Sequence, residues 1–354
     1  MTPAVSKIDS GAWAFARAMD LYARVFATGP AAGLLSRPDP VRRGGYDLRL
    51  RLDRVRAEAE DVVSLTFVHP RGTALPAWRP GAHLDVFLPS ERLRQYSLCG
   101  DPADRDRYRV AVRCIHDGDG GSREVHQALR EGDVVHVRGP RNAFRLVDAP
   151  SYLFIAGGIG ITPILPMAQA ASRRGVPWRL VYLGRSRASM PFLSELEAFP
   201  GGRLEAHCSD EQGFANIAAV VGGDADGDLY VCGPPALMDT ARQLIRAADP
   251  MRPVFSGRFS AAPVLGGKPF EIELSRSGVT VSVAHDETAL AAIRRELPGV
   301  VYSCHQGFCR TCKCRVLEGD VEHRDNGTLL DSERAEHMLI CVSRAASDRL
   351  VLDL

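Results

Sequence analysis

Four cysteines constrain this chain more than any other feature. Cys304, Cys309 and Cys312 have the spacing C-x4-C-x2-C, and Cys341 follows twenty-nine residues after Cys312. Four thiolates can hold two irons, and this is the spacing of a plant-type [2Fe–2S] cluster. The alternative, a zinc site, normally pairs two short C-x2-C knuckles, and only one is present here. We therefore expect a [2Fe–2S] cluster, with Gly307 letting the loop curl so that backbone N–H groups face the sulfurs.

Composition limits the cellular setting and the kinds of partner. The chain has nine cysteines, and four of them (Cys304, Cys309, Cys312 and Cys314) lie within eleven residues. This clustering fits a metal site in a reducing compartment better than a disulfide framework. No run of about 18 apolar residues is present, and the N-terminus does not have the pattern of a signal peptide. We expect a cytoplasmic protein with no transmembrane segment. The 44 basic and 43 acidic residues leave a net charge of +1, which argues against a nucleic-acid partner.

The first 42 residues differ in pattern from the rest of the chain. Apolar residues in 1–42 repeat at helical spacing, which predicts an N-terminal extension with an amphipathic helix. We expect this helix to pack on its own protein. Docking on a partner or on a membrane surface is the alternative.

The remaining 312 residues predict a multidomain protein. Short alternating strands in 43–149 predict an antiparallel β-barrel. Alternating strands and helices in 150–258 predict an α/β domain with a parallel sheet covered on both faces. A glycine-rich linker, 259–268, precedes a small α+β domain at 269–354. The expected strands are 46–52, 62–68, 83–88, 95–99, 108–115 and 134–138, then 152–156, 179–183, 204–208 and 229–232, then 270–274, 279–283, 314–317 and 349–352; the expected helices are 164–174, 192–198, 235–247 and 287–297.

Two motifs stand at the ends of parallel strands. Glycines at 157, 158 and 160 lie between a buried strand and a helix, where they allow a tight turn and a close approach of phosphate to backbone N–H groups. Cys232, Gly233 and Pro234 end a later strand. Ligands of open parallel sheets bind at the carboxyl ends of strands, so the two motifs together predict a nucleotide site. A plain strand-to-helix connection is the alternative for the glycine turn alone.

A third motif lies on a barrel strand. In Arg94-Gln95-Tyr96-Ser97-Leu98, strand alternation puts Arg94 and Tyr96 on one face. An aromatic ring beside an arginine can cover a flat heteroaromatic and bind its phosphate, and Gly121-Ser122 begins a helix that could bind the same anion. The alternative is a half-buried tyrosine with no ligand.

In this order the motifs resemble the phthalate dioxygenase reductase family, within the ferredoxin–NADP reductase superfamily, over residues 46–354. They are RQYSL (94–98), GGS (120–122), GGIGITP (157–163), CGPPALMD (232–239), the cysteine loop and CVSRA (341–345). The resemblance implies a flavin-binding barrel, an NAD(P)H-binding domain and a C-terminal β-grasp ferredoxin domain. It does not cover residues 1–42.

The resemblance also implies roles for particular residues at the flavin. Arg94, Arg113 and Ser122 would hold the flavin phosphate beside Gly121. Tyr96 would pack on the isoalloxazine, next to Leu98 in the motif, and Ser97 would hydrogen-bond near flavin N5. Phe259 looks like the aromatic on the other face. Relatives often have an acidic residue two positions before this aromatic, where this chain has Gly257.

At the nicotinamide nucleotide, the resemblance implies a lining and an orientation. The nucleotide would be lined by Gly157, Gly158, Gly160, Thr162, Gly233 and Pro234, with Cys232 near the ring and Met238 behind it. The family implies FMN, with FAD less favoured, and mostly NADH. NADPH stays open, because Arg185 and Arg187 follow the second parallel strand and no acidic residue is there to hold a ribose 2′-OH.

The function implied is a reductase that passes electrons from NAD(P)H through flavin to the cluster and on to a separate terminal oxygenase, either Rieske-type or a cytochrome P450. Hydride transfer to flavin needs no acid or base, so we nominate Ser97, Cys232 and Phe259 as catalytic through positioning. We expect a monomer. The alternatives are a stand-alone flavin reductase or NADH oxidase, and a redox-sensing binding module.

Overall fold

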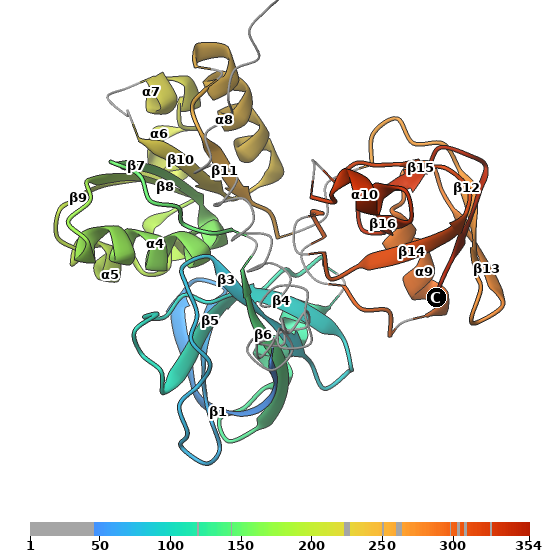
Figure 1. Ribbon diagram of the computed structural model, residues 1–354. Coiled ribbons are helices and arrows are strands. Elements are labelled where there is room, and N and C mark those ends of the chain that lie inside the picture. Colours follow the sequence, from blue (N-terminus) through green and yellow to red (C-terminus); the bar gives the residue numbers. More distant parts are fainter. Residues whose placement is uncertain are drawn as a thin grey trace, which may run out of the picture. The chain divides into compact units, whose positions relative to one another are not determined.

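A computed structural model describes most of the chain from Tyr46 onward. The described residues are 46–118, 120–142, 144–222, 227–249, 251–259, 264–297, 299–302, 305–307, 310–325 and 328–354. The expected extension, 1–42, lies outside them. Residues 44–354 form one compact unit, in which three separate sheets follow one another along the chain (Figure 1).

The first sheet is antiparallel and closes on itself. Its strands are β1 (Tyr46–Ala59), β2 (Val62–Val68), β3 (Ala82–Phe87), β4 (Leu93–Ser97), β5 (Arg107–Arg113) and β6 (Val134–Asn142), in the order β4-β3-β6-β1-β2-β5. A bridge between Leu98 and Val110 joins the two edge strands, which removes the open edges. Both residues are fully buried in the core of the barrel. Helix α3 (Gly121–Ala128) packs beside β5.

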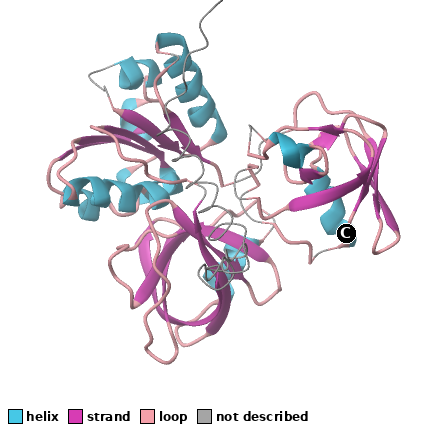
Figure 2. Ribbon diagram, viewed as in Figure 1, coloured by secondary structure: helices cyan, strands magenta, loops and turns pink. Residues whose placement is uncertain are grey.

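The second sheet is parallel and is covered by helices on both faces (Figure 2). Its strands are β7 (Tyr152–Gly157), β8 (Trp178–Gly184), β9 (Gly202–Cys208), β10 (Asp228–Cys232) and β11 (Val254–Gly257), in the order β11-β10-β7-β8-β9. The helices and 3-10 turns are η2 (Gly158–Gly160), α4 (Ile161–Arg173), η3 (Arg187–Ser189), α5 (Leu193–Glu197), α6 (Ser209–Gln212), α7 (Ile217–Gly222) and α8 (Pro235–Ala248). Strand β11 and helices α6 and α7 were not predicted.

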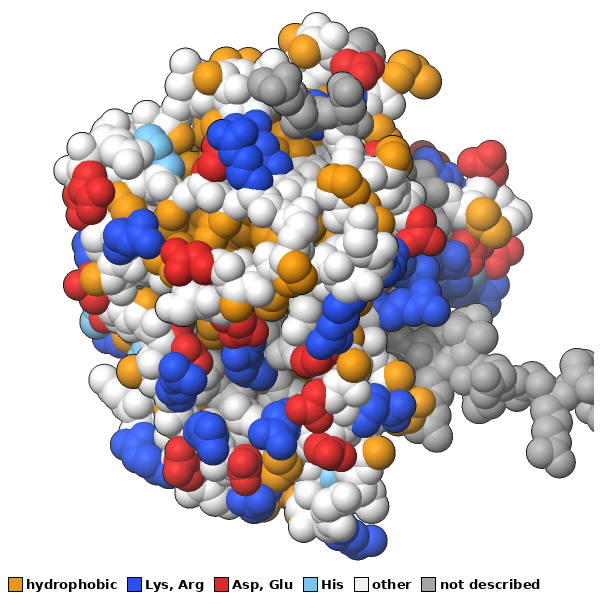
Figure 3. All heavy atoms as spheres, turned by 90° about the vertical axis from the view of Figure 1, so that its left-hand side faces the viewer, with side chains coloured by type: hydrophobic (Ala, Val, Ile, Leu, Met, Phe, Trp, Pro, Cys, Tyr) orange, Lys and Arg blue, Asp and Glu red, His pale blue; other side chains and the backbone are white. Residues whose placement is uncertain are grey.

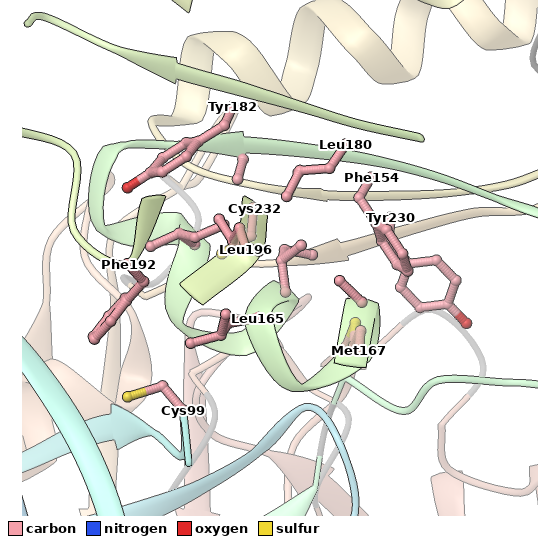
Figure 4. Close-up of a cluster of buried hydrophobic side chains, with 14 of the residues drawn as sticks. Cys99, Phe154, Leu165, Met167, Leu180, Tyr182, Phe192, Leu196, Tyr230 and Cys232 are labelled. Atoms are coloured by element: carbon pink, nitrogen blue, oxygen red, sulfur yellow. The ribbon is translucent and has the colours of Figure 1, made fainter. Parts of the chain in front are cut away.

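Alternating residues of β7 divide this domain into two cores. Phe154 and Leu165 belong to the core on the α4 side, which extends to Cys99 after the barrel strand β4 (Figure 4). Leu153 and Ile155 point the other way and pack with residues of α7 and α8. Because both faces are buried, the strand has a continuous apolar run rather than alternation.

The third sheet belongs to a small α+β domain with the β-grasp fold. It contains β12 (Phe270–Leu274), β13 (Val279–Val283), β14 (Lys313–Glu318), β16 (His337–Leu339) and β18 (Arg349–Leu352), in the order β13-β12-β18-β14-β16, with β12 and β18 parallel. A two-stranded sheet, β15 (Val321–Glu322) with β17 (Arg344–Ala345), and the helices α9 (Ala289–Glu296) and α10 (Asp331–Arg334) complete it. The predicted fold class is confirmed in all three parts.

A buried arginine ties the predicted linker to this last domain. Arg344 is 1% exposed and donates to the carbonyl oxygens of Lys268 at 2.7 Å, Ala284 at 2.9 Å and Glu287. Its guanidinium also lies 5.0 Å from the centre of the Phe270 ring. The end of the linker is therefore held to the sheet through backbone groups.

The surface of the described chain has no dominant charge on the face drawn in Figure 3, where basic and acidic side chains are interspersed. Among the described residues, no helix combines the length and the apolar character that crossing a membrane requires.

Candidate functional site

The two motifs at the ends of parallel strands meet backbone to backbone. Strands β7 and β10 are in register, with Ala156 opposite Cys232. A Cβ atom added to Gly160 would lie 2.2 Å from the carbonyl oxygen of Cys232, and one added to Gly157 would lie 2.7 Å from Cδ of Pro234. Only glycine fits at such short distances from the end of β10. At positions 157 and 160 the turn between β7 and α4 therefore presents backbone without side chains.

Thr162, in the first turn of α4, is buried. The hydroxyl of Thr162 donates to the carbonyl oxygen of Ile159 at 3.0 Å, and Thr162 is 2% exposed. It therefore shapes the turn from inside. Gly158 has φ +52°, and a Cβ there would lie 3.6 Å from Nη1 of Arg113. The structure thus puts Arg113, predicted at the flavin phosphate, beside the nucleotide turn.

A cleft brings together residues far apart in the sequence. Ser97 at the end of β4 and Phe259 after β11 both line it, and Phe259 is 48% exposed. The other lining residues are Gly81, His83, Gln95, Phe144, Pro163, Gly257, Arg258 and Gln306. Two of the three predicted catalytic residues therefore face one cleft, whose walls combine an aromatic ring with polar side chains.

The surroundings of Gly257 and Cys232 bear on the predicted flavin and nicotinamide contacts. A Cβ on Gly257 would lie 2.8 Å from Cδ1 of Phe144, so the phenylalanine ring occupies the space that an acidic side chain at this position would need. Cys232 is fully buried on the α4 side of the sheet (Figure 4). Burial also raises the pKa of its thiol. In this conformation the thiol faces the core, and its place near the nicotinamide stays a prediction.

The start of α3 carries converging arginines. A Cβ on Gly121 would lie 2.3 Å from Nε of Arg94, so this guanidinium lies over the helix N-terminus. Arg92 and Arg123 approach the neighbouring Gly120, and sequence reasoning missed both. Anions bind favourably at such a helix start, and arginine suits phosphate geometry. These positions therefore fit a phosphate group.

Tyr96 and Leu98 of the 94–98 motif contact the barrel itself. Tyr96 and Arg94 pair with Leu84 and Val86 in the β3–β4 register, which places both on the same face, as expected. Tyr96 packs against the barrel core and Leu98 closes the barrel.

Three further predicted residues lie away from the cleft wall. The hydroxyl of Ser122 accepts a hydrogen bond from the backbone N–H of Ile115 at 2.9 Å. Met238 is 1% exposed, between α8 and the parallel sheet. Arg185 is at the end of β8, with Nη2 3.1 Å from a carboxylate oxygen of Glu60.

The cysteine loop is described in part. Cys304 and Cys309 lie outside the described residues. Cys312 and Cys341 are 4% and 2% exposed, and the backbone N–H of Ile340, next to Cys341, donates to the carbonyl oxygen of Cys312 at 3.4 Å. The two thiols therefore belong to one end of the sheet, and thiolates are the ligands that iron–sulfur clusters require.

The backbone of this loop curls as expected from Gly307. That residue has φ +76°, and His305 and Arg310 also have positive φ, 55° and 60°. Cys314 lies beyond the loop in β14, opposite Met338, with its side chain buried in the domain core. The described residues thus fit a cluster with Cys314 outside the ligand set.

One residue of the loop reaches the cleft. Gln306 lies between Cys304 and Cys309 in the sequence, and its Nε2 donates to the carbonyl oxygen of Arg258 at 2.5 Å. Arg258 precedes Phe259, and Gln306 itself lines the cleft. The aromatic wall of the cleft and the cysteine loop are therefore in contact.

A barrel with a ligand cleft, a parallel sheet with a glycine turn, and a cysteine-loop domain define the class of iron–sulfur flavoprotein oxidoreductases that use nicotinamide nucleotides. Residues 272–346 match the 2Fe-2S iron-sulfur cluster binding domain. The chain is 36% identical over 316 residues to phthalate dioxygenase reductase of Burkholderia cepacia, covering 87% of this chain and 97% of that protein. It belongs to the phthalate dioxygenase reductase family, whose members are electron-transfer reductases.

Further relatives agree with this family. A putative toluene-4-sulfonate monooxygenase system reductase subunit of Comamonas testosteroni is 39% identical over 320 residues, covering 87% of this chain and 99% of that protein. The solved structure of phthalate dioxygenase reductase, described as modular for electron transfer from pyridine nucleotides to [2Fe–2S], superposes with a TM-score of 0.64 at 36% identity, covering 87% of this chain and 98% of that one. An intact type IV self-sufficient cytochrome P450 monooxygenase gives 0.71 at 36% identity, covering 93% of this chain and 45% of the P450 chain.

Proposed function

We propose that this protein passes electrons from NADH through FMN and a [2Fe–2S] cluster to a separate terminal oxygenase, either Rieske-type or a cytochrome P450. The observation that carries the proposal is the cleft shared by Ser97, Phe259 and Gln306, because it brings residues predicted at the flavin against the cysteine loop. A bound flavin accepts a hydride and releases single electrons, which the one-electron cluster needs.

The side chains act by holding and orienting. Arg94 over Gly121 anchors the phosphate, while Ser97 and Phe259 bound the ring. Backbone N–H groups at the turn from Gly157 to Gly160 receive the nicotinamide nucleotide at the start of α4. No proton moves to or from a side chain in hydride transfer, so these roles are sufficient.

The contacts at the end of β8 support NADH rather than NADPH. Arg185 pairs with Glu60 at 3.1 Å and Arg187 with Glu197 at 3.5 Å. A 2′-phosphate would have to displace a carboxylate from either guanidinium. FMN rather than FAD follows from the family resemblance.

The oxygenase partner and the cellular compartment are inferred from the names of relatives and from the cysteines. By their names, relatives serve a toluene-4-sulfonate monooxygenase system and a haem-dependent oxidative N-demethylase, and a similar chain forms part of a self-sufficient cytochrome P450 monooxygenase, so more than one kind of oxygenase suits the family. Five described cysteines outside the predicted cluster ligands (Cys99, Cys114, Cys208, Cys232 and Cys314) form no disulfide, which supports the cytoplasm. We further propose a monomer with domain boundaries at 43–149, 150–258 and 269–354, joined by the linker 259–268.

Anaerobic titration with NADH, followed in the visible spectrum, tests the proposal. We expect flavin and cluster bands to bleach together at about 1.5 NADH per chain, two electrons for the flavin and one for the cluster. Cys312→Ser should lose the cluster bands and the reduction of cytochrome c while keeping flavin reduction. The matched control Cys314→Ala should keep both. If the flavin alone bleaches in the wild type, the protein is a stand-alone flavin reductase, and if cytochrome c is not reduced over many turnovers, the redox-sensing reading holds.

A further inference from the structure

Arg258, which directly follows β11, is held by two different parts of the chain. Its Nη2 donates to Oδ1 of Asp239 on α8, and the Arg258 side chain is 12% exposed. Its backbone carbonyl oxygen accepts a hydrogen bond from Nε2 of Gln306 in the cysteine loop at 2.5 Å. One residue therefore joins the parallel-sheet domain to the cysteine loop. The next residue is Phe259, the aromatic wall of the cleft.

Strand register places this junction at the edge of the sheet that carries the nucleotide motif. Gly257 is opposite Cys232 in the parallel pair of β11 and β10, so Arg258 leaves the sheet beside the start of α8. Asp239 lies one turn into that helix. The strand and the helix thus bring the guanidinium and the carboxylate together at one end of the sheet.

A second arginine makes Asp239 the anchor of the whole segment. Arg242 has Nη1 3.4 Å from the same Oδ1 of Asp239, and its Nη2 donates to the hydroxyl of Ser256 on β11 at 2.7 Å. Burial, followed by the charge of Arg258, lowers the pKa of Arg242, because the two guanidinium groups repel each other. In the described chain Asp239 is the one acidic side chain that pairs with either arginine. Removing its carboxylate would therefore push Arg258 away from α8.

We propose that Asp239 is a positioning residue that, through Arg258, holds the cysteine loop against the flavin cleft. The inference rests on the proposed function, because the loop needs a fixed distance from the cleft only if electrons pass from flavin to cluster. The ion pair fixes the backbone at Arg258, and the carbonyl oxygen there fixes Gln306 of the loop. A side chain on the helix that begins at the nucleotide motif thus controls the path to the cluster.

The first test asks whether Asp239 holds Arg258, and it uses the full chain without any turnover. Trypsin cleaves after an arginine only when that side chain is released from the fold, so brief digestion and mass spectrometry follow the cut after Arg258. Asp239→Ala should speed this cut about fivefold, the upper end for a solvent-accessible ion pair, and Asp239→Glu should restore slow cleavage. Gln243→Ala, at an exposed position of the same helix, is the matched control and should be cut like wild type. Wild-type cleavage in Asp239→Ala would overturn the proposal.

The second test asks whether the pair positions the cysteine loop. Stopped-flow mixing with NADH in the absence of oxygen separates bleaching of the flavin bands from bleaching of the cluster bands. Asp239→Ala and Gln306→Ala should each slow the cluster step about tenfold while the oxidised protein keeps its cluster bands. The double variant should be no slower than the slower single variant, because Asp239 acts through the contact between Arg258 and Gln306.

The outcomes separate this proposal from the function on which it rests. Faster cleavage after Arg258 with an unchanged cluster step would show that the ion pair holds the segment without positioning the loop, which overturns the proposal. Additive slowing in the double variant overturns it as well. Arg258→Leu removes the same pair from the other side, so an unchanged cluster step in that variant is decisive even if Asp239→Ala does not fold. A wild type whose cluster NADH does not bleach would instead refute the proposed function.

Discussion

Replacing Gly160 by alanine tests the contact between the two nucleotide motifs. Gly160 has φ −60°, which alanine adopts readily, so the change causes no backbone strain by itself. The new Cβ would lie 2.2 Å from the carbonyl oxygen of Cys232, 2.5 Å from its carbon and 2.8 Å from the nitrogen of Gly233. All three atoms are backbone, so no side chain can rotate away.

The size of the effect follows from this geometry. Moving the oxygen contact from 2.2 Å to the ordinary 3.4 Å separates the η2 turn from the end of β10 by about 1.2 Å. Overpacking of this kind costs about 1–3 kcal/mol, and each kcal/mol lowers the Tm of a domain this size by about 4–8 °C. A misplacement near 1 Å at a positioning element can also slow the chemistry by about a hundredfold.

Two assays check this reasoning. Thermal unfolding followed by circular dichroism should show the lower Tm, and anaerobic stopped-flow reduction of the flavin by NADH should show the lower rate. Gly222→Ala, where no atom lies within 4 Å of the added Cβ, is the matched control and should behave as wild type. A Gly160→Ala variant with wild-type Tm and NADH reduction would refute the proposed contact and the nucleotide site built on it.

Two other variants examine interactions away from the cleft. Hydrogen bonding to Arg179 holds the pKa of Glu205 below its ordinary value of 4.5, so the carboxylate stabilises the fold above pH 4.5 and loses this effect as pH falls through the lowered pKa. Glu205→Gln should therefore cost about 0.5–1 kcal/mol at pH 7 in urea unfolding, and a gap that persists in acid would contradict the pairing. Arg344→Leu leaves three carbonyl oxygens without their donor and should cost at least about 3 kcal/mol, whereas Arg349→Leu, in an exposed pair with Glu273, should change the free energy of unfolding by less than about 1 kcal/mol.

Local patterns in the sequence predicted much of the fold. The hairpin strands 270–274 and 279–283 match β12 and β13, because alternation and the turn at Gly278 fix both ends. Strand β1 runs to Ala59 rather than 52, since its second half is mostly charged, contains no fully buried residue and gives little hydrophobic signal. Strand β11 has only four residues, too few for a period to be recognised.

The motifs of the candidate site could be predicted from the sequence, but most contacts between side chains at the site could not. The meeting of Gly160 with Cys232 could be expected, because parallel strands bring their carboxyl ends to one edge. The pairing of Asp239 with Arg258 could not, because a helical or strand period assigns a face to a residue and does not reveal the partner beside it. Phe144 was missed for the same reason, since only packing shows that its ring fills the space beside Gly257.

The shared cleft has a thermodynamic consequence for the whole chain. Its walls come from the barrel at Ser97, from the segment after the parallel sheet at Phe259, and from the cysteine loop at Gln306. A ligand that binds only when these segments are together adds its binding free energy to the stability of their assembly, about 2.7 kcal/mol at a free concentration one hundred times its Kd. If the flavin binds in this cleft, as proposed, its binding and the attachment of the ferredoxin part to the rest of the protein stabilise each other.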